Sequence, residues 1–243
     1  MKSKILSFIF CTVLASGLSA QSIQVQYKMT PKKLDQKGLG DIDNAAQRKK
    51  IAEALNQPQY YRLQYRQGAS LYINNTDEYP KKDEPNNLEE IGVKLITISA
   101  SEGLYKNFKT NEYRYSKNIL TKPFLIIDTL QIPHWKITGE TDSIGGYKTQ
   151  KATAIIDGKK VMAWYSDEIP VSDGPANYYG LPGLILKTED EGKTYEALKI
   201  STEKDFEIVK PTKGKQVNRE THKKIYDQKI KELKSNPSKI LKF

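Results

Sequence analysis

Acidic side chains gather around a long connection that is rich in proline and glycine. They are Asp167, Glu168, Asp173, Glu189, Asp190 and Glu191. If the apolar run 184–188 pairs with the run 161–165, Asp167 and Asp173 would lie at one rim of a sheet. Two carboxylates there could act as acid and base in hydrolysis, or as oxygen ligands for calcium. Their spacing matches no calcium-binding loop, and acidic residues are ordinary at strand ends, so we predict no metal site.

Hydrolysis by a serine nucleophile is the second chemistry that these residue types allow. The chain has two histidines, and His134 lies close in sequence to Asp128. A Ser-His-Asp arrangement needs the three groups to converge in space, and no nucleophile-elbow spacing supports it. We therefore predict that His134 is a hydrogen-bonded strand residue and that His222 is solvated. The sequence identifies no catalytic residue.

Aromatic side chains surround the same connection, residues 166–183. Trp164 and Tyr165 precede it, and Tyr178 and Tyr179 lie near its end. Tyrosine and tryptophan combine apolar area with a polar tip, which suits sugar faces, peptides and protein partners. A long connection without secondary structure is commonly functional or tightly packed on itself. These four residues are candidate binding residues, and the alternative is that their rings belong to the core.

The connection ends in a motif that carries no ionisable side chain. Gly180, Leu181, Pro182 and Gly183 lead directly into Leu184, Ile185 and Leu186. Pro182 fixes its own φ, and Gly183 can take the positive φ of a type II turn. The unbroken apolar run predicts a strand covered on both faces. With Gly174 and Pro175 upstream, this motif is predicted to be a structural latch.

Residues 1–20 have the pattern of a signal peptide. Lys2 and Lys4 precede an apolar run, and small residues lead to a predicted cleavage between Ala20 and Gln21. The only cysteine, Cys11, lies in this segment, so the mature chain would have neither a disulfide nor a thiolate metal site. The segment is too short to span a bilayer, and no later stretch comes close. We expect an exported protein of the periplasm or cell surface, without a cofactor.

Basic residues dominate the charge, with 39 lysines and arginines against 29 acidic residues and a formal net charge of +10. Much of the excess follows Pro211, where residues from about 215 to 235 have the periodicity of a helix. Interleaved stacking aromatics are missing there, which argues against a nucleic-acid partner. The helix could contact an anionic surface, and the alternative is an ordinary solvated face.

Short alternations of apolar and polar residues predict strands along most of the chain. Their spacing of roughly ten residues is typical of a meandering antiparallel sheet. Further expected elements are hairpins at Gln67-Gly68, Asp157-Gly158 and Glu191-Gly192, a strand at 93–98, and a helix from Asp43 or Asn44 to Leu55. We predict one mainly β domain, residues 21–243, folded as a curved antiparallel sheet or a partly open β-barrel.

A series of short motifs follows a fixed order between residues 104 and 202. They are Trp135–Thr138, Ile144–Tyr147, Lys151–Thr153, Ala163–Tyr165, Glu168–Pro170, Gly174-Pro175 and Gly180–Ile185. In this order they resemble the signature of the GLPGLI family, exported proteins of Gram-negative bacteria. The family is similar to the bowl-like N-terminal domain of a secreted peptide-N-glycosidase, which implies a curved, partly open barrel. It implies no catalytic residue. Family members often carry cysteine where this chain has Thr149.

Two functional hypotheses follow from the sequence. The leading one is a non-catalytic envelope protein that binds an envelope protein, a peptide or a glycan through the aromatic loop or the mouth of the barrel. The alternative is a glycan or peptide hydrolase that uses the carboxylates at the rim. An exposed tyrosine patch would favour binding, whereas carboxylates that converge in a deep cleft would favour the enzyme.

Overall fold

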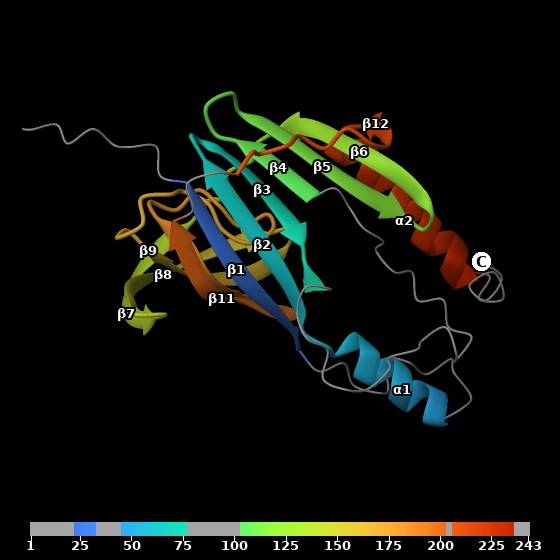
Figure 1. Ribbon diagram of the computed structural model, residues 1–243. Coiled ribbons are helices and arrows are strands. Elements are labelled where there is room, and N and C mark those ends of the chain that lie inside the picture. The colour runs from blue at the N-terminus through green and yellow to red at the C-terminus, as the bar shows by residue number, and fades with distance from the viewer. Residues whose placement is uncertain (1–21, 33–44, 77–102, 203–205, 236–243) are drawn as a thin grey trace, which may run out of the picture.

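The computed structural model describes residues 22–32, 45–76, 103–202 and 206–235 (Figure 1). Twelve strands form one sheet in the order β12-β6-β5-β4-β3-β2-β1-β11-β10-β9-β8-β7. The strands are β1 (Ile23–Pro31), β2 (Gln59–Arg66), β3 (Ala69–Asn74), β4 (Gly103–Asn107), β5 (Glu112–Ile119), β6 (Lys122–Thr129), β7 (Lys136–Ile144), β8 (Tyr147–Ile156), β9 (Lys159–Ser166), β10 (Leu184–Glu189), β11 (Lys193–Thr202) and β12 (Lys215–Val217). Neighbouring strands are antiparallel except β12 and β6, which are parallel. The prediction of a mainly β fold is confirmed, and the sheet is mixed because of β12.

Tight turns connect several strands where the sequence predicts them. Gln67 and Gly68 join β2 to β3 with φ values of 53° and 86°, and Asp157 and Gly158 join β8 to β9 with 50° and 77°. Positive φ at both central positions is the geometry of a type I′ turn, which matches the twist of the flanking strands. β10 and β11 form the third predicted hairpin. The predicted strand 93–98 and the signal segment 1–20 lie outside the described residues.

The sheet curls, so that strands far apart in its order face one another across the concave side. Tyr115 on β5 and Tyr195 on β11 are five places apart in the strand order. Their phenol groups nevertheless interact across the concave side. Burial raises the pKa of Tyr115, and the nearby phenol groups of Tyr195 and Tyr61 raise it further. The rings of Tyr61 and Tyr195 pack edge to face, with their centroids 6.1 Å apart. This curvature fits the expected partly open, barrel-like shape.

The helix α1 (Ala45–Leu55) lies where a short helix is predicted, and its Ile51 and Ala52 are buried. The helix α2 (Arg219–Ser235) is shorter than the predicted span from about 215, because residues 215–217 form β12. The side-chain oxygen of Asn218 accepts a hydrogen bond from the backbone N–H of Thr221 at 2.8 Å. This is an N-cap contact, and it explains why α2 begins at Arg219.

The helix α2 packs against the concave face of β5 and β6. The guanidinium of Arg219 lies 3.7 Å from the ring centroid of Tyr113, and the His222 ring packs edge-on against Phe124 at 5.8 Å. His222 is buried, with 8% of its surface exposed. The prediction that His222 is solvated is therefore wrong, because its side of the helix faces the sheet.

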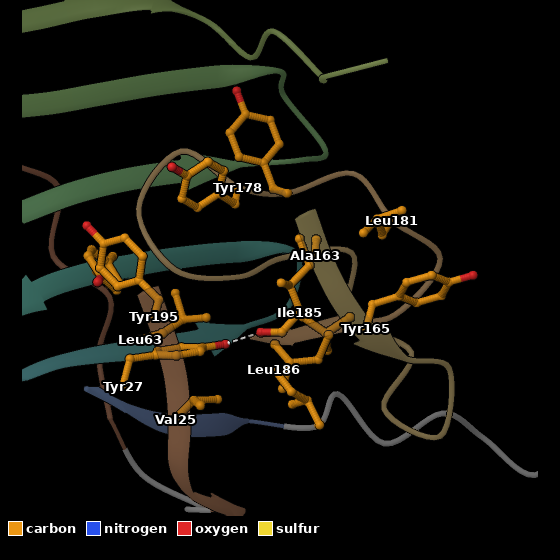
Figure 2. Packing of buried hydrophobic residues seen from close by; sticks show 14 of the residues in the cluster. Val25, Tyr27, Leu63, Ala163, Tyr165, Tyr178, Leu181, Ile185, Leu186 and Tyr195 are labelled. Carbon is orange, nitrogen blue, oxygen red and sulfur yellow. Dashed lines mark hydrogen bonds between the residues drawn. The ribbon is translucent and has the colours of Figure 1, made fainter. Parts of the chain in front are cut away.

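The connection between β9 and β10, residues 167–183, folds into the concave side and forms part of the core. Its buried apolar residues are Ile169, Val171, Tyr178, Tyr179 and Leu181. Figure 2 shows two of them, Tyr178 and Leu181, above the strands that carry Val25, Tyr27 and Leu63. The hydroxyl of Tyr27 donates a hydrogen bond of 2.7 Å to the carbonyl of Ile185. Leu184, Ile185 and Leu186 are fully buried, as predicted for a strand covered on both faces.

The reason for glycine at position 183 differs from the predicted one. Positive φ occurs at Gly180, with 93°, and Gly183 is not among the residues with positive φ. A Cβ atom on Gly183 would instead lie 2.0 Å from the carbonyl oxygen of Ser166. The motif therefore needs glycine here for the close approach of two backbone segments, at the point where β9 ends and β10 begins.

Candidate functional site

A buried ion pair anchors the loop 167–183 to β4. The Nζ atom of Lys106 donates to the Oδ1 atom of Asp173, and also to the carbonyl oxygens of Ala176 at 3.2 Å and Gly174 at 3.3 Å. Three acceptors match the three donors of an ammonium group. Both side chains are fully buried. Burial lowers the pKa of Lys106, while the contact with Asp173 acts in the opposite direction.

This pair corrects the expectation that Asp167 and Asp173 share one rim. β10 does pair with β9, as that expectation required. Asp167, however, is exposed at the start of the loop, whereas Asp173 points inward to Lys106. A carboxylate held by a buried ammonium group cannot exchange protons with a substrate at the surface. Asp173 is therefore a structural residue of the loop.

A second set of polar contacts fixes the end of the loop to the turn between β10 and β11. The hydroxyl of Tyr178 donates to Asp190 Oδ2 at 2.8 Å. Asp190 Oδ1 accepts the backbone N–H groups of Gly192 at 2.7 Å and Lys193 at 3.0 Å. Burial raises the pKa of Tyr178, and the bond to Asp190 adds to the rise. Burial would raise the pKa of Asp190 too, but the Gly192 and Tyr178 bonds bring it below its ordinary value.

A pocket of about 360 Å³ opens beside this Tyr178–Asp190 bond. Three segments surround it: the β8–β9 hairpin, the loop at 176–178 and the β10–β11 turn. Its lining residues are Ile156, Asp157, Lys159, Val161, Ala176, Asn177, Tyr178, Asp190, Gly192 and Lys193. The pocket thus combines amide, carboxylate and ammonium groups with an apolar wall. That composition suits a small polar ligand with a ring or other apolar face.

The four candidate aromatic residues do not lie on one surface. Residues that alternate along a strand point to opposite faces, so Trp164 and Tyr165 on β9 are separated by the sheet. Tyr165, Tyr178 and Tyr179 are buried, with 2%, 8% and 1% of their surface exposed. Trp164 is half-buried on the other face. Of the four, only Tyr178 lines the pocket, and no exposed tyrosine patch is formed by these residues.

Trp164 lies between two lysines from the neighbouring strands. Lys151 on β8 and Lys187 on β10 both pair with Trp164 in the strand register. Their Nζ atoms lie 5.7 Å and 5.1 Å from a ring centroid of Trp164. Lys151 also bonds Glu140 at 2.8 Å. Trp164 is therefore an outer-face residue in contact with cations, and it is not connected to the pocket.

The histidines do not assemble a catalytic group with the residues considered from the sequence. His134 is exposed and precedes β7, so the prediction of a hydrogen-bonded strand residue is wrong. The carboxylate of Asp128 accepts the backbone N–H groups of Thr129 and Arg219. Within the described residues, no three histidine, cysteine, aspartate or glutamate side chains gather closely enough to hold a metal ion. Over the same residues, no helix has the length and apolar character needed to cross a bilayer.

Sequence reasoning missed Lys106, Asn177 and Lys193. For Lys106 a signal existed, because it alternates with Leu104 and Phe108 and so occupies a position facing the core. Asn177 and Lys193 gave no such signal, since a polar residue in a turn is ordinary. The fold alone brings these two residues to one pocket.

A curled sheet whose concave side is filled by its own loop defines a bowl-like β domain. A family described as "Protein of unknown function (Porph_ging)" matches residues 155–187. The matched segment runs from the β8–β9 hairpin into β10, and it contains Gly180–Ile185, the last of the ordered motifs on which the GLPGLI resemblance rests.

Among solved structures, the chain is similar to PNGF-II, whose structure is known in two crystal forms, C2 and P21. In both, the TM-score is 0.54 and the sequence identity 19%, over 85% of this chain. The match spans 33% of PNGF-II, so this chain corresponds to about a third of that protein. At this identity the similarity concerns the fold. No curated protein matches the sequence.

Proposed function

We propose that this chain is an exported, non-catalytic protein of the cell envelope that binds a saccharide in the pocket beside Tyr178. Export rests on the signal-peptide pattern of residues 1–20, and we place the mature protein in the periplasm or at the cell surface. The observation that carries the proposal is the pocket itself. It presents Asn177, Asp190 and Lys193 on elements that are held in place by hydrogen bonds.

The chemistry of the lining favours a saccharide. Hydroxyl groups of a sugar both donate and accept hydrogen bonds, so an amide, a carboxylate and an ammonium group suit them together. Val161 and Tyr178 supply the apolar contact that a sugar face needs. Because the loop is anchored through Lys106 and Asp173, little ordering is required when the ligand binds.

Hydrolysis remains the competing function, and two carboxylates in the pocket, Asp157 and Asp190, motivate it. Asp190 is a poor general acid, since its pKa is lowered and its oxygens already accept three hydrogen bonds. Asp157 would then have to supply both the acid and the base. Binding without turnover is the better account of these groups.

A glycan array probed with the full mature chain tests the proposal. We expect the wild type to bind a defined set of glycans, and Asn177→Ala to weaken that binding about tenfold. Lys199→Ala is the matched control, because Lys199 is exposed on β11 and is not among the pocket residues. Equal binding by wild type and Asn177→Ala would rule out this pocket. Release of new reducing ends from a bound glycan would favour the hydrolase.

A further inference from the structure

The side-chain amide of Asn177, which lines the pocket, is held in one orientation by Tyr113. The hydroxyl of Tyr113 on β5 donates a hydrogen bond of 3.2 Å to Asn177 Oδ1. A buried phenol needs an acceptor, and of the two ends of an amide only the oxygen accepts. Tyr113 is itself fixed, because only 3% of its surface is exposed and the guanidinium of Arg219 lies 3.7 Å from its ring centroid. The amide oxygen of Asn177 is therefore committed to Tyr113.

The amide nitrogen of Asn177 supplies the donors that remain for a ligand. Among the described residues, Asn177 makes no hydrogen bond through this nitrogen, and the residue is exposed. Two N–H donors in a fixed orientation suit a ligand atom that only accepts, such as a carbonyl oxygen. A sugar hydroxyl both donates and accepts, so either orientation of the amide would satisfy it. The fixed amide thus favours a carbonyl group over a hydroxyl group.

The backbone that carries Asn177 has an unusual conformation. Ala176 has a positive φ of 50°, which is unfavourable for a residue with a Cβ atom. Lys106 Nζ donates to the carbonyl oxygen of Ala176 at 3.2 Å, and the backbone N–H of Tyr178 donates to the carbonyl oxygen of Pro175 at 3.0 Å. Strained backbone that the surrounding contacts maintain is found mainly at functional sites. It is a second, independent sign that position 177 takes part in binding.

An apolar wall lies in the same pocket as this donor. Its residues are Ile156, Val161 and Ala176. Ala176 is the immediate neighbour of Asn177 in the chain, so apolar surface and amide lie side by side. The charged residues of the lining are two acidic and two basic ones, Asp157, Asp190, Lys159 and Lys193. Because their formal charges cancel, the pocket favours a neutral ligand group.

We propose that the pocket recognises the acetamido group of an N-acetylated sugar. The carbonyl oxygen of the acetamido group accepts a hydrogen bond from Asn177 Nδ2, and its methyl group packs against the apolar wall. Tyr113 is a positioning residue, since it touches Asn177 and keeps the donor end of the amide available. This inference rests on the proposed function and specifies its ligand, because a neutral group that joins a carbonyl oxygen to a methyl group meets all three features of the pocket.

The test is a titration of the full mature chain, followed by nuclear magnetic resonance. The probes are N-acetylglucosamine, glucosamine, glucose and N-methylacetamide. We expect N-acetylglucosamine to bind about tenfold more tightly than glucose or glucosamine, because only it offers both a carbonyl oxygen and a methyl group. Asn177→Asp should abolish this preference, since a carboxylate has no N–H donor.

The orienting role of Tyr113 is tested by the same preference. Tyr113→Phe should reduce it to about threefold, because the amide is then free to turn its oxygen toward the ligand. Tyr165→Phe is the matched control, since the Tyr165 hydroxyl also donates to a side-chain amide, that of Gln150 at 2.8 Å, and neither residue lines the pocket. The control should keep the full preference. A Tyr113→Phe variant that also keeps it would overturn the positioning role.

The remaining outcomes separate this inference from the proposed function. If N-acetylglucosamine, glucosamine and glucose bind equally, the saccharide function stands and the acetamido site is wrong. If glucosamine alone matches N-acetylglucosamine, the pocket recognises the nitrogen and the acetamido site is again wrong. If N-methylacetamide binds through Asn177 but no sugar binds, recognition of the amide stands and the saccharide function is wrong. If none of the four probes binds, the acetamido site is overturned.

Discussion

Lys106 and Asp173 are 67 residues apart in the chain and form an ion pair in which neither side chain has any exposed surface. The pair joins the fourth strand to the loop that carries Asn177 and Tyr178. Because the same ammonium group also bonds the carbonyl oxygens of Gly174 and Ala176, it fixes the backbone of the loop as well as one side chain. Stability and the shape of the pocket thus depend on one contact.

Removing either partner of this pair should strongly destabilise the fold. Lys106→Met would leave the Asp173 carboxylate buried without a counter-ion, and Asp173→Asn would leave the ammonium group in the same state. We expect each change to lower the free energy of unfolding by about 3–5 kcal/mol, the usual effect of breaking a buried pair. Urea unfolding of the mature chain measures it.

An exposed pair supplies the matched control. Lys151 and Glu140 form an ion pair at 2.8 Å, with 65% of the Glu140 side chain exposed. Lys151→Met should change the free energy of unfolding by less than about 1 kcal/mol. A Lys106→Met variant that unfolds at the same urea concentration as wild type would contradict the structural role of the buried pair.

A single methyl group at Gly183 should be enough to disturb the junction of β9 and β10. The added Cβ would meet the Ser166 carbonyl oxygen at 2.0 Å and the backbone nitrogen of Asp167 at 2.8 Å. Backbone atoms cannot move aside cheaply, so we expect Gly183→Ala to cost about 3 kcal/mol. Gly139→Ala is the control, because nothing lies within 4 Å of the Cβ added there. Equal melting temperatures for the two variants would exclude the close-approach explanation.

Local features of the sequence predicted much of the sheet. Alternating residues gave the strands, and pairs such as Asp157-Gly158 gave the hairpins, because a turn of this kind needs only two adjacent residues. The burial of Leu184–Leu186 was also predictable from a local pattern, because a continuous apolar run predicts a strand covered on both faces. The conformation of Gly183 was not, since its neighbour Ser166 precedes it by a long loop.

The candidate site was predicted less well, because it depends on contacts between distant segments. Alternation along β9 could have separated Trp164 from Tyr165 at the outset. Nothing local distinguishes Asp173, which bonds Lys106 inside the fold, from Asp190, which lines the pocket. Both are acidic residues near a glycine. The curvature that brings Tyr115 on β5 toward Tyr195 on β11 is a property of the whole sheet, so no local pattern could predict which residues face each other across it.

Thr149 offers a test of polar burial in the core. It is fully buried, and its hydroxyl has no hydrogen-bond partner in the part of the chain that the structure describes. Thr149→Val keeps the shape and removes the unpaired hydroxyl, so it should stabilise the fold by about 1 kcal/mol. Thr138→Val is the control, and it should destabilise the fold. The Thr138 hydroxyl donates a hydrogen bond to the Lys151 carbonyl at 3.1 Å, and the substitution removes that bond. A destabilised Thr149→Val variant would show that the hydroxyl is satisfied in solution.

The many buried phenol groups should make the fold sensitive to alkaline pH. Burial raises the pKa of Tyr27, Tyr61, Tyr65, Tyr72, Tyr113, Tyr115, Tyr165, Tyr178 and Tyr195. For Tyr61 the pKa rises to about 12 from an ordinary value of 10.0. Above pH 10 the unfolded chain loses phenolic protons that the folded chain retains, so the free energy of unfolding falls as pH rises. Below pH 10 this contribution to stability is fully present.

Urea unfolding at stepped pH values, with tyrosinate absorbance recorded in parallel, measures this effect. We expect most of the tyrosinate signal to appear in the same cooperative transition that unfolds the chain. Tyr61→Phe should make the loss of stability between pH 10 and about 12 shallower than in wild type, because one group with a raised pKa is removed. Tyrosinate that forms with an ordinary pKa while the chain stays folded would mean that the phenol groups on the concave side are open to water.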